Sequence, residues 1–224
     1  MSIVIPKTAL ISLSDKTNLE TIVSYLIKKK VKIISTGGTF KAIKKITNEV
    51  LEVSEFTGFE EMMDGRVKTL HPKIHAGILA RRDQDMEVLK QKDFEAIDLV
   101  IVNLYPFQET IKDGCSFEEA IEKIDIGGPT MIRAAAKNFN DVVVLSDPDD
   151  YENVIKEWDE NDGISYDCRK YLSQKVFATM ANYNKSISQY LNRLDSDLHY
   201  YNFEKGNAIK IWRKSSSKCN IIHV

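Results

Sequence analysis

The sequence predicts an α/β fold with a mostly parallel sheet and a C-terminal helical extension. Short runs rich in β-branched residues alternate along the 224 residues with amphipathic stretches, an order typical of β–α–β units. After the last of these runs, Tyr166–Leu194 keeps a helical pattern of apolar residues. The chain is long enough for one well-buried core with some additional structure.

Each element is predicted from its local pattern. Buried strands are expected where a short apolar run stands between polar turns, and helices where apolar residues recur every three or four positions. The predicted strands are Thr8–Ser12, Val31–Ser35, Val50–Val53, Ala76–Ala80, Asp98–Leu104 and Asp141–Leu145. The predicted helices are Asp15–Lys30, a segment from the Thr36–Thr39 turn through Ile46, and segments near 85–92, 116–124 and 128–137.

The last helix leaves two interpretations open. Its apolar side packs either on a partner chain or following domain, or back on the core of its own chain. The residues on that side are Leu172, Val176, Phe177, Met180, Tyr183, Ile187, Tyr190 and Leu191.

Composition argues against several classes of function. A net charge of −2 and a pI near 6.1 give no electrostatic reason to expect a nucleic-acid partner. Cys115, Cys168 and Cys219 lack metal-ligand spacing and are expected to be reduced thiols. Neither a signal peptide nor an apolar run near the roughly 20 residues of a membrane span is recognisable, so we expect a soluble, cytoplasmic protein without a membrane partner.

Two predicted strands end in small hydroxyl residues at helix starts. Because ligands of parallel α/β sheets lie beyond the carboxyl ends of the strands, these loops are candidates for one phosphate site, with glycines allowing close approach and hydroxyls and an ammonium donating. Either loop alone is equally explained by ordinary helix capping. The candidate residues are Ser12, Ser14 and Lys16 in the first loop and Ser35, Thr36, Gly37, Gly38 and Thr39 in the second.

A dense basic segment precedes the predicted strand Ala76–Ala80. Arg66 could bind an anion through two guanidinium nitrogens, and Lys68 could be the electrophilic or acidic group. His71 and His75 are four positions apart, but Pro72 lies between them and no carboxylate or cysteine is near, which disfavours zinc. A structural role for at least one histidine is the stronger interpretation.

Further polar groups are predicted near the same sheet edge. Asn103 and Tyr105 end the strand Asp98–Leu104, although Tyr-Pro is also a common strand terminator. Asp125 stands between two isoleucines, where a carboxylate is costly unless it is paired or works chemically. The next glycines free backbone donors at a helix start, and two basic residues four apart share a face of that helix. These residues are Gly127, Gly128, Arg133 and Lys137.

In this order, the segments ISLSDK, STGGT, GRVKTLHPKIHAGILARR, NLYPF, IDIGGPTMIRAAAKN and VVVLSDPDDY resemble the IMP cyclohydrolase domain, the amino-terminal half of the bifunctional purine-biosynthesis proteins. The similarity covers roughly residues 8–200. It implies a methylglyoxal-synthase-like three-layer sandwich, a homodimer, and dehydrative ring closure of the formylated ribotide FAICAR to IMP. The implied partner is this small purine nucleotide, and neither metal nor redox cofactor is implied.

The resemblance also implies roles for the candidate residues. Asp125 orients and deprotonates the carboxamide, Lys68 stabilises or protonates the formyl oxygen, and Tyr105 and Lys137 complete the proton network. The residues implied to hold the ribose phosphate are Ser12, Ser14, Lys16, Ser35, Thr36, Gly37, Gly38, Thr39 and Arg66. Those implied to line the base site are Thr69, Asn103, Ile126, Gly127 and Gly128.

The alternatives are a phosphate-binding lyase of the methylglyoxal-synthase type, a non-catalytic nucleotide-binding regulatory module, and a remnant with poor turnover. The DIGGPTMIRAAAKN segment argues against the first, and the joint presence of Lys68, Tyr105, Asp125 and Lys137 against the second.

The end of the chain departs from the family pattern. We expect residues 1–200 to form the cyclohydrolase domain and 201–224 to be a linker remnant and tail, with the family's transformylase domain absent. One permitted set of codons from Ala208, with a single A deleted, reads AIKYGENPHQN, which resembles the opening of that second domain. Residues from about Ile211 would then be out of frame; the alternative is a genuine basic extension.

Overall fold

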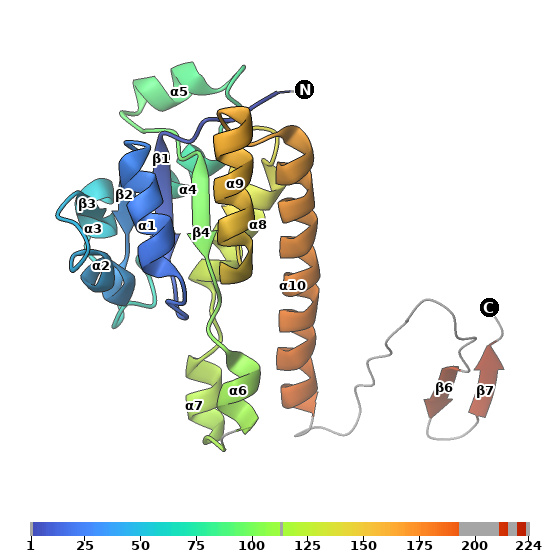
Figure 1. The fold of residues 1–224 in the computed structure, drawn as a ribbon. Coiled ribbons are helices and arrows are strands. Elements are labelled where there is room, and N and C mark those ends of the chain that lie inside the picture. Colours follow the sequence, from blue (N-terminus) through green and yellow to red (C-terminus); the bar gives the residue numbers. More distant parts are fainter. Residues whose placement is uncertain (1, 113, 193–210, 215–218, 223–224) are drawn as a thin grey trace. The chain divides into compact units, whose positions relative to one another are not determined.

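The computed structural model describes residues 2–112, 114–192, 211–214 and 219–222 (Figure 1). It divides into two units, Met1–Ile187 and Ser188–Val224, which are described separately. In the second unit, β6 (Ile211–Lys214) pairs antiparallel with β7 (Cys219–Ile222). The predicted boundary at residue 200 lies outside the described residues, and the reading-frame hypothesis stays a prediction.

The first unit is built on a parallel sheet, as predicted. Its strands follow the order β3-β2-β1-β4-β5, and every pairing is parallel. All five carboxyl ends therefore lie at one edge of the sheet. The strands are β1 (Thr8–Ser12), β2 (Lys32–Ser35), β3 (Val50–Glu52), β4 (Leu99–Val102) and β5 (Val143–Leu145).

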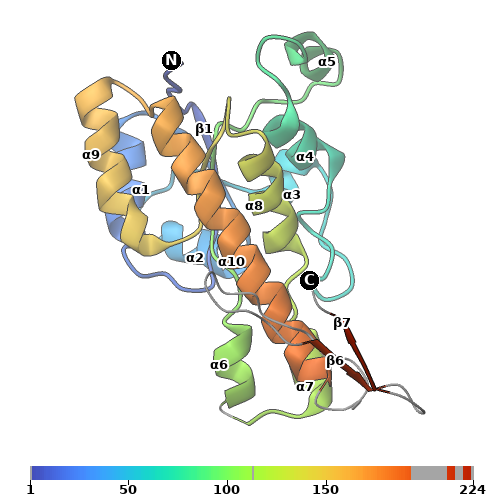
Figure 2. The same cartoon turned by 90° about the vertical axis from the view of Figure 1, so that its right-hand side faces the viewer.

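Helices cover both faces of this sheet, which confirms the α/β class. Figure 2 shows α1 and α9 on one side of the sheet and α4 and α8 on the other. In the described part of the chain, no helix is long and apolar enough to cross a membrane. The helices are α1 (Leu19–Lys28), α2 (Gly37–Ile43), α3 (Val53–Thr57), α4 (Pro72–Leu79), α5 (Met86–Gln91), α6 (Phe107–Lys112), α7 (Phe117–Glu122), α8 (Gly127–Lys137), η1 (Pro148–Asp150), α9 (Tyr151–Asn161) and α10 (Tyr166–Asn192).

The predicted strand Ala76–Ala80 is wrong, because this segment belongs to helix α4. The helix begins with Pro72 in its first turn, and His71 caps it: the Lys73 N–H donates to His71 Nδ1 at 3.1 Å. Ile74, Gly77 and Ile78 then recur at helical spacing and are buried.

Helix α10 packs on the core of its own chain. This confirms, for three residues of its apolar side, the prediction that the helix folds back on that core. Leu172, Val176 and Met180 are buried in the same core cluster as the strands, whereas Phe177 is 44% exposed. Near its start, the buried Arg169 donates to the backbone carbonyls of Phe139, Asn140, Ile164 and Ser2. This guanidinium fixes the start of α10 to the amino terminus.

Candidate active site

The two hydroxyl-rich loops lie side by side at the carboxyl edge of the sheet. Ser12 Oγ and Thr36 Oγ1 are 2.9 Å apart. Thr39 Oγ1 accepts from the Leu13 N–H at 2.8 Å and donates to the Leu13 carbonyl at 3.0 Å. Thr36 precedes α2 but makes no side-chain capping bond, so simple capping does not explain its hydroxyl.

The end of β4 orders the first loop. Asn103 Oδ1 accepts from the backbone N–H groups of Ser14 and Asp15, at 2.7 and 3.1 Å, and its Nδ2 donates to the Asp15 carbonyl at 2.7 Å. Lys16 Nζ donates to the carbonyls of Leu13 and Ser14 at 3.3 Å. The loop is thus preorganised, and α1 begins only at Leu19, later than predicted.

Lys68 approaches the start of α2. A Cβ atom placed on Gly37 would lie 3.4 Å from Lys68 Nζ. Glu61 Oε2 forms an ion pair with the same ammonium at 3.5 Å. Lys68, Thr36, Gly37 and Glu61 help to line a cavity of about 300 Å³. Lys68 therefore lies beside the second hydroxyl loop, as a phosphate or oxyanion partner would.

Asp125 is the one carboxylate among the predicted site residues, and it is half-buried. The Gly128 N–H donates to its Oδ1 at 2.8 Å, at the amino terminus of α8. Burial raises its pKa, against the lowering effect of N–H donors from Gly128, Tyr105 and Gly127 and of the Lys68 charge. A carboxyl group with a raised pKa and a cation nearby is suited to proton transfer.

Three of the residues predicted to line the base site, Thr69, Gly127 and Gly128, lie close to one another or to Asp125. A Cβ atom on Gly127 would lie 2.6 Å from Thr69 Oγ1, and one on Gly128 would lie 2.5 Å from Asp125 Oδ2. Tyr105 and Ile126 are 50% and 57% exposed. This arrangement leaves no room for side chains at either glycine.

Two predicted site residues, Arg66 and Lys137, are not held at the predicted site. Arg66 is exposed and pairs with Glu122 at 2.6 Å. Lys137 ends α8, ten residues after Gly127, so about 15 Å of helix separates it from the Asp125 end. The described chain does not bring Lys137 to its own Asp125, and its predicted role stays untested.

The histidines have structural surroundings. His71 caps α4, which confirms the structural interpretation for one of them. His75 Nε2 is buried and has no hydrogen-bond partner among the residues that the structure describes, and burial lowers the pKa of this imidazole. In the residues that the structure covers, no three His, Cys, Asp or Glu side chains gather as metal ligands would.

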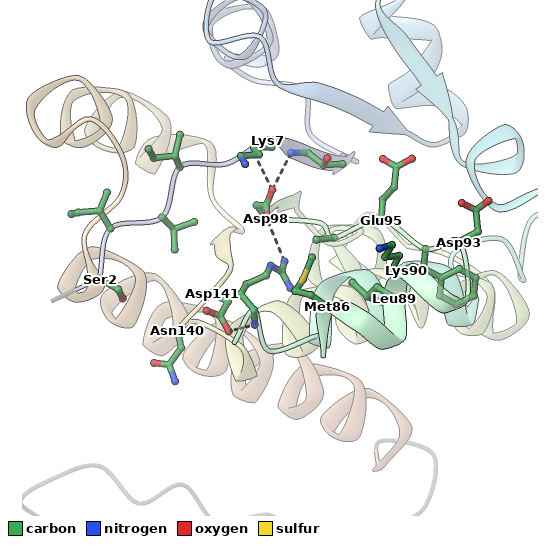
Figure 3. A pocket seen from close by; sticks show the side chains of 17 residues that line it. Ser2, Lys7, Met86, Leu89, Lys90, Asp93, Glu95, Asp98, Asn140 and Asp141 are labelled. Atoms are coloured by element: carbon green, nitrogen blue, oxygen red, sulfur yellow. Dashed lines mark hydrogen bonds and ion pairs between the residues drawn. The ribbon is translucent and has the colours of Figure 1, made fainter. Parts of the chain in front are cut away.

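A larger cavity, of about 660 Å³, opens at the opposite edge of the sheet (Figure 3). Lys7, Asp98 and Asp141 lie around it, where β1, β4 and β5 begin. Asp98 Oδ2 accepts from the Lys7 N–H at 2.9 Å, and its Oδ1 pairs with Arg82 Nη2 at 3.2 Å. These polar groups therefore pair with one another. Because ligands of parallel α/β sheets bind at the carboxyl edge, this cavity is not the candidate site.

One contact to the site was not predicted from the sequence. The Asp125 N–H donates to the hydroxyl of Tyr183 on α10, at 2.8 Å. The sequence signal was only a tyrosine on the apolar side of a helix, which does not reveal a partner 58 positions away.

The fold and the candidate site define a class of protein: a parallel α/β protein whose candidate site residues gather at the carboxyl edge of the sheet. The chain belongs to the MGS-like domain family, whose model matches residues 18–130. A model described as the AICARFT/IMPCHase bienzyme matches residues 135–217. These matches confirm the resemblance inferred from the motifs.

Relatives and a solved structure agree. The bifunctional purine biosynthesis protein PurH of Fusobacterium nucleatum is 54% identical over 197 residues, covering 87% of this chain and 39% of that protein. PurH of Clostridium acetobutylicum is 53% identical over 187 residues, covering 83% and 38%. The chain thus spans about two fifths of these relatives. A structure titled "Crystal structure of ForH" is 33% identical with a TM-score of 0.71, covering 82% of this chain and 98% of that one.

Proposed function

We propose that this chain is an IMP cyclohydrolase of purine biosynthesis that closes FAICAR to IMP. The observation that carries the proposal is a half-buried carboxylate, Asp125, that is close enough to Lys68 to feel its charge, together with two hydroxyl-rich loops at one sheet edge. The relatives named as purine biosynthesis proteins support the same pathway.

In the proposed reaction the carboxamide nitrogen attacks the formyl carbon of the same molecule. The new C–N bond forms, the nitrogen loses its proton to Asp125, and the formyl oxygen takes negative charge that Lys68 neutralises. That oxygen then leaves as water, with one proton from Lys68 and the proton that Asp125 accepted; as the C–O bond breaks, the formamide nitrogen forms the ring C=N bond and returns its own N–H proton to Lys68. The step is an orientation problem that a rigid site solves by holding both groups in contact.

The raised pKa of Asp125 sets a pH dependence. Only the ionised carboxylate can accept the amide proton, so turnover should rise with pH through the raised pKa of this group.

The phosphate would be held by the Ser12 and Thr36 hydroxyls and the loop backbone of Gly37 and Gly38.

We further propose that the chain acts as a cytoplasmic homodimer, with the purine nucleotide as its partner and no nucleic acid or membrane. Lys137 supports the homodimer: it is exposed at the far end of α8, so a second copy offers a route by which a Lys137 reaches an Asp125.

The proposed function is tested by an assay of FAICAR ring closure, in which the reaction is monitored through the change in ultraviolet absorbance. Lys68→Ala and Asp125→Asn should lower kcat by roughly a hundredfold to ten-thousandfold. The exposed Lys156→Ala and Asp167→Asn are matched controls and should retain turnover. Near-wild-type turnover in Lys68→Ala would reject its role, and phosphate release from dihydroxyacetone phosphate instead of ring closure would indicate a lyase.

A further inference from the structure

Helix α10 contacts the loop that carries Asp125. The backbone N–H of Asp125 donates to Tyr183 Oη at 2.8 Å, and the tyrosine is half-buried. This hydroxyl receives a hydrogen bond from the very residue whose carboxylate the proposed reaction uses.

The same part of α10 also holds the segment that follows Tyr105. The rings of Phe107 and Tyr183 meet edge to face, with centroids 6.4 Å apart and an interplanar angle of 69°. One turn further along α10, Ser186 Oγ accepts from Gln108 Nε2. Both cartoon views show this end of α10 beside α6 (Figures 1 and 2).

These contacts fix the two backbone segments that donate to the Asp125 carboxylate. Its donors are the N–H groups of Gly128 and Gly127, at the start of α8, and of Tyr105, just before α6. The carboxylate position therefore depends on how α8 and the Tyr105 segment are held relative to each other. Tyr183 contacts Asp125, two residues before α8, through its hydroxyl, and Phe107, two residues after Tyr105, through its ring.

We propose that Tyr183 is a positioning residue for the ring-closing reaction, which fixes the Asp125 backbone so that the carboxylate meets the reacting amide. The inference rests on the proposed function and deepens it. Tyr183 touches no reacting atom in this scheme; it acts through Asp125.

Loss of the hydroxyl has a specific electrostatic consequence. The groups that act on the Asp125 charge are the Lys68 ammonium, the half-buried Tyr183 and the N–H donors of Gly128, Gly127 and Tyr105. A loosened loop weakens the N–H contacts first, because these depend steeply on geometry. The burial effect remains, so the pKa of Asp125 should rise further.

The test is Tyr183→Phe, which keeps the ring contact with Phe107 and removes only the hydroxyl. Tyr171→Phe is the matched control, since Tyr171 lies on the same helix and is 59% exposed. With FAICAR we expect Tyr183→Phe to lower kcat about tenfold, leave KM within about twofold, and move the acid limb of the kcat profile to higher pH. Tyr171→Phe should change none of these, and thermal unfolding checks that both variants fold.

A second readout does not need turnover. Carbon-13 NMR titration of the aspartate carboxyl groups, with the Asp125 signal assigned by its loss in Asp125→Asn, should show a higher pKa in Tyr183→Phe than in the wild type. An unchanged carboxyl titration together with wild-type kcat in Tyr183→Phe overturns the inference. A wild-type chain that fails to close FAICAR rejects the proposed function instead, while the NMR shift still decides whether Tyr183 sets the carboxylate.

Discussion

Replacing Gly128 by alanine should displace the Asp125 carboxylate. The added Cβ would lie 2.5 Å from Asp125 Oδ2 and 2.8 Å from Leu104 Cδ2, whereas ordinary contacts begin near 3.4 Å. The carboxylate oxygen would have to retreat by about 0.9 Å, the difference between these distances. A misplacement of about 1 Å in a catalytic group can cost roughly a hundredfold in rate, or about 2.7 kcal/mol of barrier.

The assay is the ring-closing rate of FAICAR for Gly128→Ala beside Glu152→Ala. Glu152 also lies in the first turn of a helix, α9, but it is exposed and belongs to no predicted part of the site, so this control should retain turnover. Alanine is the best helix former and favours a helix over glycine by about 1 kcal/mol, so neither variant should unfold for reasons of propensity. Turnover of Gly128→Ala within threefold of the wild type would refute the view that this close approach positions the carboxylate.

The remaining predictions concern stability. Gly77→Ala should lower the free energy of unfolding by about 1–3 kcal/mol in urea titrations, because its Cβ would lie 2.5 Å from the Glu95 carbonyl; an unchanged midpoint would contradict this. Arg169→Ala should cost about 3 kcal/mol or more in the same assay, since several carbonyls lose their donor, and a loss below 1 kcal/mol would show that water replaces it. The Lys175 ammonium lowers the pKa of Asp147 below its ordinary value of 3.8 in the folded protein. The ion pair therefore stabilises the fold above pH 3.8, and this contribution is lost as the pH falls through the lowered pKa. The urea midpoint of Lys175→Met, measured between pH 5 and 2, should lack the part of the fall that comes from this ion pair. A midpoint that falls in parallel with that of the wild type would reject the pairing.

The sheet could be predicted from the sequence because its central strands are short, apolar and β-branched. Ala76–Ala80 misled because a five-residue apolar run fits a buried strand or a buried helix equally well. The better signal preceded it: His71 and Pro72 form a helix start, and Ile74 continues the helical spacing.

The proximity of some candidate residues could be predicted where these residues follow strand ends, while their roles stay predictions. Parallel strands bring their carboxyl ends to one edge, so Ser12, Thr36 and Asn103 meet whatever the helices do. Tyr183 could not be found in this way, because its place depends on how a long helix packs across the domain. The separation of Lys137 from Asp125 likewise follows from helix length rather than from any local motif.

Arg169 has a consequence for the order of folding. Its guanidinium is satisfied only when carbonyls from Ser2, Phe139 and Ile164 have gathered, and Ser2 is 167 positions away. Such long-range contacts form late in folding, because the entropy cost of closing the long loop between them comes before the contacts form. Removing this side chain should therefore speed unfolding while leaving the refolding rate almost unchanged, which makes the arginine a determinant of how long the native state lasts rather than of how quickly it is reached.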